Sequence, residues 1–151
     1  MQQQAQTQQW AGTAPVQPEG AALIREALND GIAHAAEMHR HALETATAFR
    51  AGGERKALGL YIEFLNGFDS LAQLLDCTGR ALSIDFAATP FGAATVTRFV
   101  EDLNTLLSET MKAQERKDWV LLADLLEYEL APHLESWQKV FVLLGEKVPA
   151  A

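Results

Sequence analysis

Apolar side chains recur every three or four residues along most of the chain. One such row begins in the segment that starts at Glu19 and contains Leu28, Ile32, Ala35, His39, Ala42, Ala46 and Phe49. Residues three and four apart share one face of an α-helix, so this row predicts an amphipathic helix with one buried stripe. Gly52 and Gly53 predict its end, because glycine readily adopts the left-handed conformation that closes a helix.

Three further segments show the same period. A second row runs from Ala57 to Leu75 and a third from Val96 to Thr110, and a fourth helix is expected from Trp119 to Leu144 behind an N-cap at Asp118. Since alternating β-branched runs are lacking in the sequence, we predict an all-α fold, an antiparallel four-helix bundle with mostly short connections. The pattern leaves open whether residues 79–90 cross the bundle or extend the second helix.

Pro132 lies inside the predicted fourth helix. Proline removes a backbone N–H and clashes with the preceding turn, at a cost of about 3 kcal/mol in a helix interior. We therefore expect the last helix to be kinked at Pro132. On a helical wheel, the core stripe of this helix consists of Trp119, Ala123, Leu126, Leu130, Leu134, Trp137, Phe141 and Leu144.

A second apolar row lies on the opposite side of the same helix, and it consists of Leu121, Leu125, Tyr128 and Pro132. The core stripe already accounts for one side, so this row predicts an exposed patch. Exposed apolar patches usually mark interfaces. We take these four residues as the candidate partner-binding site, for a second copy of the chain or for another protein.

Composition places residues 19–151 in a single helical domain and residues 1–18 in a disordered Gln/Pro-rich tail, since six of the first nine residues are glutamine. The formal net charge of −8 argues against nucleic acid and against an anionic membrane surface as partners. No apolar run approaches the length of a membrane span, about 18 residues. The single Cys77 is compatible with a reducing compartment, so we expect a cytoplasmic protein.

Histidines cluster in the first predicted helix, where His34, Glu37 and His41 are spaced by three and four residues. This spacing could place three metal ligands on one helix face. All three lie away from the core line, however, and a metal site inside a bundle needs inward ligands. We therefore expect no metal or cofactor. The sequence also lacks a nucleophile triad, a phosphate loop and a CxxC motif, so we expect no enzymatic activity.

The segment WVLLADLLEYELAPHLESW, from Trp119 to Trp137, resembles a small bacterial family of helical proteins of unknown function. Members of that family carry a motif close to LADLLEYELxPxLxxW near the C-terminus. The resemblance implies a helical fold and a preserved kink, and it implies no activity. In helix order alone, the chain is similar to flagellar export chaperones of the FliS type, small acidic bundles that hold a partner's helices in an apolar groove.

These observations favour a non-enzymatic protein-binding or scaffolding bundle that self-associates or holds a helical partner. Two alternatives remain open at this point. One is an export or assembly chaperone, and the other is a bundle metalloprotein using the histidine and glutamate ligands.

Overall fold

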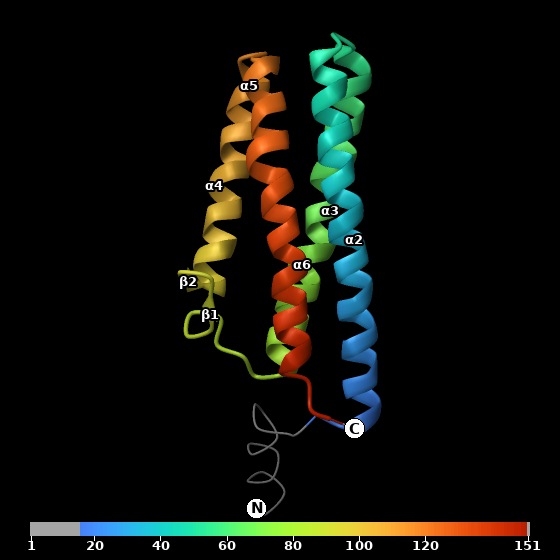
Figure 1. Cartoon of the computed structure of the whole chain (residues 1–151), viewed down its shortest axis with the longest axis vertical. Helices are drawn as coiled ribbons and strands as arrows, with labels where there is room; N and C mark the ends of the chain where they lie inside the picture. The colour runs from blue at the N-terminus through green and yellow to red at the C-terminus, as the bar shows by residue number, and fades with distance from the viewer. Residues whose placement is uncertain (1–15, 151) are drawn as a thin grey trace, which may run out of the picture.

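Helices make up most of the protein (Figure 1). The computed structural model describes residues 16–150. Helix α2 spans Pro18–Arg50, α3 spans Glu54–Ala81 and α4 spans Val96–Glu115. Three segments then follow without interruption: α5 (Trp119–Asp124), the π-helix η1 (Leu125–Leu130) and α6 (Ala131–Glu146). Two short antiparallel strands, β1 (Pro90–Phe91) and β2 (Ala94–Thr95), precede α4. The all-α prediction is confirmed.

The helices lie alongside one another and alternate in chain direction, with the α5–η1–α6 rod as the fourth (Figure 1). Their contacts are uneven. Helix α2 packs along both α3 and α6, whereas α4 rests chiefly on α5 and η1. Comparable backbone contacts between α4 and either α3 or α6 are lacking in the described part of the chain. Helices α3 and α4 are therefore less closely packed against each other than neighbouring helices in the antiparallel four-helix bundle that we predicted.

The joints between helices follow the local sequence. Helix α2 ends just before Gly52, which has a φ of +83°, and the Asp118 carboxylate accepts a hydrogen bond of 3.1 Å from the backbone N–H of Leu121. Both features were predicted. Helix α3 ends at Ala81, so residues 79–90 do not extend it by two turns. The connection instead leads into the β1–β2 hairpin, which the sequence pattern did not predict.

The core stripe predicted for the last helix is confirmed almost throughout. Seven of its members are at most 1% exposed: Ala123, Leu126, Leu130, Leu134, Trp137, Phe141 and Leu144. Trp119 is half-buried and stacks on Phe49 of α2, with 5.3 Å between the ring centroids. Helix α6, which carries much of this stripe, packs chiefly against α2.

The irregularity around Pro132 differs from the predicted one. We predicted an α-helix kinked at the proline, and the structure has a π-helix immediately before it. The backbone N–H of Ala131 donates to the carbonyl of Leu126, five residues back rather than four. Pro132 then occupies the first turn of α6, where a missing N–H is tolerated.

Residues 1–15 of the predicted N-terminal tail lie outside the described residues. Helix α2 begins at Pro18, the last residue of that predicted tail. Between residues 16 and 150, no helix is both long and apolar enough to cross a membrane.

Candidate functional site

The predicted partner-binding patch is not continuous. Tyr128 is 64% exposed, Leu121 is 42% exposed and Pro132 is exposed, but Leu125 is only 8% exposed. The prediction for Leu125 is therefore wrong. The segment η1 contacts both α2 and α4, so more of its circumference is covered than a single buried stripe implies. Its π register also changes the angle between successive side chains from that of the α-helical wheel.

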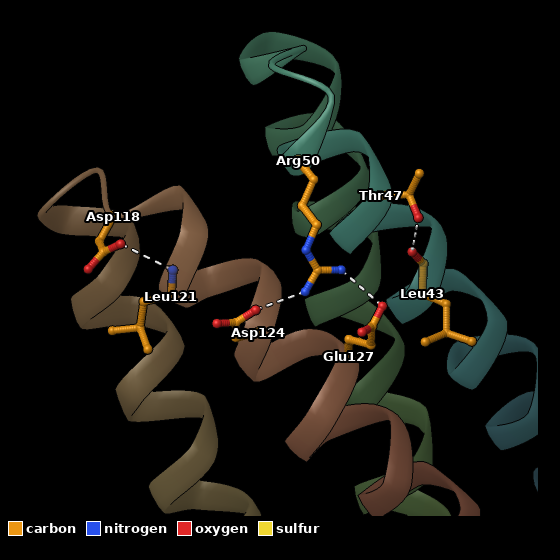
Figure 2. Close-up of polar contacts among 7 residues, drawn as sticks. All are labelled: Leu43, Thr47, Arg50, Asp118, Leu121, Asp124 and Glu127. Atoms are coloured by element: carbon orange, nitrogen blue, oxygen red, sulfur yellow. Dashed lines mark hydrogen bonds and ion pairs between the residues drawn. The ribbon is translucent and has the colours of Figure 1, made fainter.

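A clamp around Arg50 joins the end of α2 to the start of the last helix (Figure 2). One guanidinium nitrogen lies 2.9 Å from the Asp124 carboxylate, and another lies 2.9 Å from the Glu127 carboxylate. The hydrogen bond with Asp124, helped by that with Glu127, raises the pKa of Arg50. The positive charge also suits the C-terminal end of the helix dipole. Sequence reasoning missed this clamp, because its partners are far apart in the chain.

Tyr128 belongs to the same network. The Arg50 guanidinium carbon lies 5.9 Å from the centroid of its ring, within the range of a cation–π contact. Hydrogen bonding between Tyr128 and Glu127 raises the pKa of the phenol and, together with Arg50, lowers that of the carboxyl. The ring that we expected to anchor a partner is therefore engaged by its own chain.

A second apolar site lies between α3 and α4. It is a cavity of about 460 Å³ with Trp137 of α6 among its lining residues. Its walls are made chiefly by apolar side chains: Phe68, Ala72 and Leu75 on α3, and Val100, Leu103 and Leu107 on α4. We call this site the α3–α4 groove. Phe68, Leu75 and Leu103 are buried, Val100 and Leu107 are half-buried and Ala72 is exposed, so the apolar lining is accessible in part.

A side-chain contact lies beside each end of the α3–α4 groove. At one end, the buried Tyr61 hydroxyl donates to the Thr110 hydroxyl at 3.0 Å and so links α3 to α4. Burial raises the pKa of this phenol. At the other end, Phe86 from the connection packs over Gly79, where a Cβ atom would lie 2.5 Å from the ring. Phe86 lines the groove, whereas Tyr61 and Thr110 do not.

The position of α4 beside the groove is set by an aromatic contact with α6. The His133 ring stacks on Phe99, with 4.1 Å between centroids and 7° between planes, and its Nε2 lies 3.1 Å from the Phe99 carbonyl oxygen. Burial lowers the pKa of His133, although the hydrogen bond opposes this shift. Phe99 also meets Trp137 edge to face at 5.2 Å. Stacked and edge-to-face aromatic rings therefore join α4 to α6.

The metal-ligand candidates gather at a different place, a cleft of about 280 Å³ between α2 and α3 lined by His34, Glu37 and His41. The half-buried His34 has its Nε2 3.0 Å from the Gly67 carbonyl oxygen, and Glu37 forms an ion pair with Arg40. Within residues 16–150, no group of three or more His, Cys, Asp or Glu side chains has an arrangement that could hold a metal ion.

Comparisons with known proteins give a family and no function. No curated protein and no solved structure matches the chain. The protein family described as "Domain of unknown function (DUF8042)" matches residues 26–140, which include both walls of the α3–α4 groove and the segment Trp119 to Trp137. The expected membership of a family of unknown function is confirmed. Since this match covers well over half of the sequence, the chain belongs to the DUF8042 family.

Proposed function

We propose that this chain is a non-enzymatic, cytoplasmic protein-binding module that holds a helix of a partner protein in the α3–α4 groove. The observation that carries the proposal is the open side of the fold. Apolar side chains of α3 and α4 line a cavity of about 460 Å³, in which Ala72 is exposed and Val100 and Leu107 are half-buried. Apolar surface left accessible in this way gains free energy when a partner covers it.

The dimensions of the groove favour a short helix. Its walls extend over residues 68–76 on α3 and residues 97–107 on α4. At 1.5 Å per residue, these spans correspond to about 12 and 15 Å, or two to three helical turns. An amphipathic helix of that length presents anchors at i, i+3 or i+4, and i+7 to a groove.

An extended peptide fits this site less well. The walls are helices whose backbone N–H and C=O groups are used within the helices themselves. An extended strand would therefore find few backbone partners in the groove and would leave its own polar groups unpaired at a cost. The backbone N–H and C=O groups of a helix bond to each other within the helix, so only the side chains of a helical partner need to fit the groove.

The surface of Leu121, Tyr128 and Pro132 is a weaker candidate. Leu125, which would connect Leu121 to Tyr128, is buried, and Tyr128 is occupied by Arg50 and Glu127. The α3–α4 groove is one continuous cavity lined chiefly by apolar side chains, so we assign partner binding to the groove rather than to this divided patch.

A pair of tryptophan variants tests the proposal. Ala72 is exposed and lines the groove, so Ala72→Trp places an indole where the partner would lie. Gln73 is exposed and does not line it, so Gln73→Trp is the matched control. Both variants and the unmodified chain are used for affinity purification from the native host with mass spectrometry, alongside light scattering on the pure proteins.

We expect one protein with a helical binding segment to be retained by the unmodified chain and by Gln73→Trp but lost with Ala72→Trp. A single dominant client that is exported or assembled elsewhere would identify the module as a chaperone. Self-association that Ala72→Trp abolishes would identify the partner as a second copy. Retention of the same proteins by all three chains would contradict the proposal.

A further inference from the structure

We infer that the occupant of the α3–α4 groove is a basic amphipathic helix, with lysine or arginine on both flanks of its apolar edge. This inference rests on the proposed function, because it names the chemistry of the partner that the groove receives. It depends on the charges at the rim of the groove, whereas the proposed function depends on its apolar walls.

Every charged side chain that lines the groove is acidic. Asp69 and Asp76 belong to the α3 wall and Glu101 belongs to the α4 wall. All three are exposed. Asp69 and Glu101 have no ion-pair partner among residues 16–150, while Asp76 lies 3.0 Å from Arg80 one turn further along α3. Two carboxylates on opposite walls are therefore available to an incoming cation.

Neighbouring basic residues do not cancel this field. Arg80 already pairs with Asp76, and Arg98 of α4 pairs with Asp102 at 3.0 Å. Neither arginine lines the groove. The chain as a whole carries a formal net charge of −8, so its background field also attracts a cationic partner and disfavours an acidic one.

The placement of the two available carboxylates specifies a pattern on the partner. Asp69 lies on the α3 wall, where Asp76 already pairs with Arg80. A helix lying along the groove can meet Asp69 with a basic residue on one flank. Glu101 on the opposite wall would meet a second basic residue on the other flank. Between the flanks, leucine or phenylalanine side chains would fill the space over Trp137.

Synthetic peptides test this pattern directly. The first is a helical peptide of about 10 residues, with leucines at i, i+4 and i+7 and with lysines at the two flank positions. The second keeps the leucines and replaces the lysines with glutamine, and the third replaces them with glutamate. Isothermal titration calorimetry measures the affinity of each peptide for the full chain at low and high ionic strength.

The matching protein variants separate the rim from the overall charge. Asp69→Asn combined with Glu101→Gln neutralises the rim. Glu109→Gln combined with Glu115→Gln removes the same charge from exposed positions of α4 outside the groove. Ala72→Trp blocks the groove itself.

We expect the lysine peptide to bind more tightly than the glutamine peptide, and the glutamate peptide to bind least. Neutralising the rim should weaken binding of the lysine peptide about two- to thirty-fold, as expected for two exposed ion pairs, and leave the glutamine peptide unchanged. The Glu109 and Glu115 control should have a smaller effect. The preference for lysine should shrink as salt screens the exposed charges.

Two results separate the inference from the proposed function. Equal binding of the lysine and glutamine peptides, both blocked by Ala72→Trp, would overturn the basic partner and leave the helix-binding groove in place. Equal weakening by the rim variant and the Glu109 and Glu115 control would also overturn it, because overall charge alone would then be responsible. Binding that Ala72→Trp does not affect, or no binding by any peptide, would count against both.

Discussion

Removing the hydrogen bond between Tyr61 and Thr110 tests directly how α3 is held to α4. Both side chains are 0% exposed, and the Tyr61 hydroxyl donates to the Thr110 hydroxyl, which donates in turn to the Leu107 carbonyl at 2.8 Å. Tyr61→Phe removes the first donor and leaves the Thr110 oxygen with one fewer partner. A buried hydrogen bond of this kind contributes about 0.5–1.5 kcal/mol. We therefore expect the free energy of unfolding to fall by about 1 kcal/mol and Tm by about 2–4 °C.

Thr110→Val should cost more. It leaves the buried phenol O–H of Tyr61 without an acceptor, and an unpaired buried donor costs about 1–3 kcal/mol. Tyr61→Phe with Thr110→Val removes both partners, so the double variant should lose less stability than the two single variants together. Tyr128→Phe removes an exposed hydroxyl and should change stability by less than about 0.5 kcal/mol.

Urea unfolding followed by circular dichroism measures all four variants, and the slope of unfolding with urea checks that each remains two-state. The reasoning is refuted by additive losses in the double variant, or by a Tyr61→Phe protein as stable as the unmodified chain. Either outcome would mean that the two hydroxyls do not depend on each other and that α3 and α4 are held together by other contacts.

Three further predictions address burial, titration and close packing. Leu125→Ala should cost about 2–4 kcal/mol because the side chain is 8% exposed, whereas Leu121→Ala at 42% should cost less than about 1 kcal/mol; chemical denaturation distinguishes them. Burial lowers the pKa of His133 below its usual 6.5, so the unfolded chain binds a proton at this residue more readily than the folded chain. The contribution of neutral His133 to folding stability is therefore fully present above pH 6.5 and is lost as the pH falls from 6.5 towards the lowered pKa. Unfolding measured between pH 8 and 5 should show this decline, and His133→Gln should reduce it. Gly79→Ala should destabilise the protein because a Cβ at this position would overlap the Phe86 ring. Gly59→Ala has open space around the site and should add up to about 1 kcal/mol of stability, measured by thermal unfolding.

Local chemistry made much of the fold predictable. The positions of Asp118 and Gly52 depend on backbone groups within a few residues, so their roles as a cap and a helix stop follow from the sequence. The core stripe containing Leu130 and Trp137 follows from helical periodicity alone. These features need no knowledge of which helices are neighbours.

Features that depend on several segments at once were not predictable in the same way. The burial of Leu125 follows from the register of η1 and from coverage by both α2 and α4, neither of which a wheel contains. The contacts of Arg50 with Asp124 and Glu127 join residues more than seventy positions apart. Periodicity shows that α3 and α4 each have an apolar face, but it does not show that a cavity lies between the two faces.

The short walls of the groove limit how much of a partner it can cover. They extend over residues 68–76 of α3 and residues 97–107 of α4, or about 12 and 15 Å at 1.5 Å per residue. In a longer helix, only two to three turns would gain free energy from burial there, and the apolar side chains of the remaining turns would stay in water. Lengthening the apolar edge of a partner beyond three turns should therefore add little affinity.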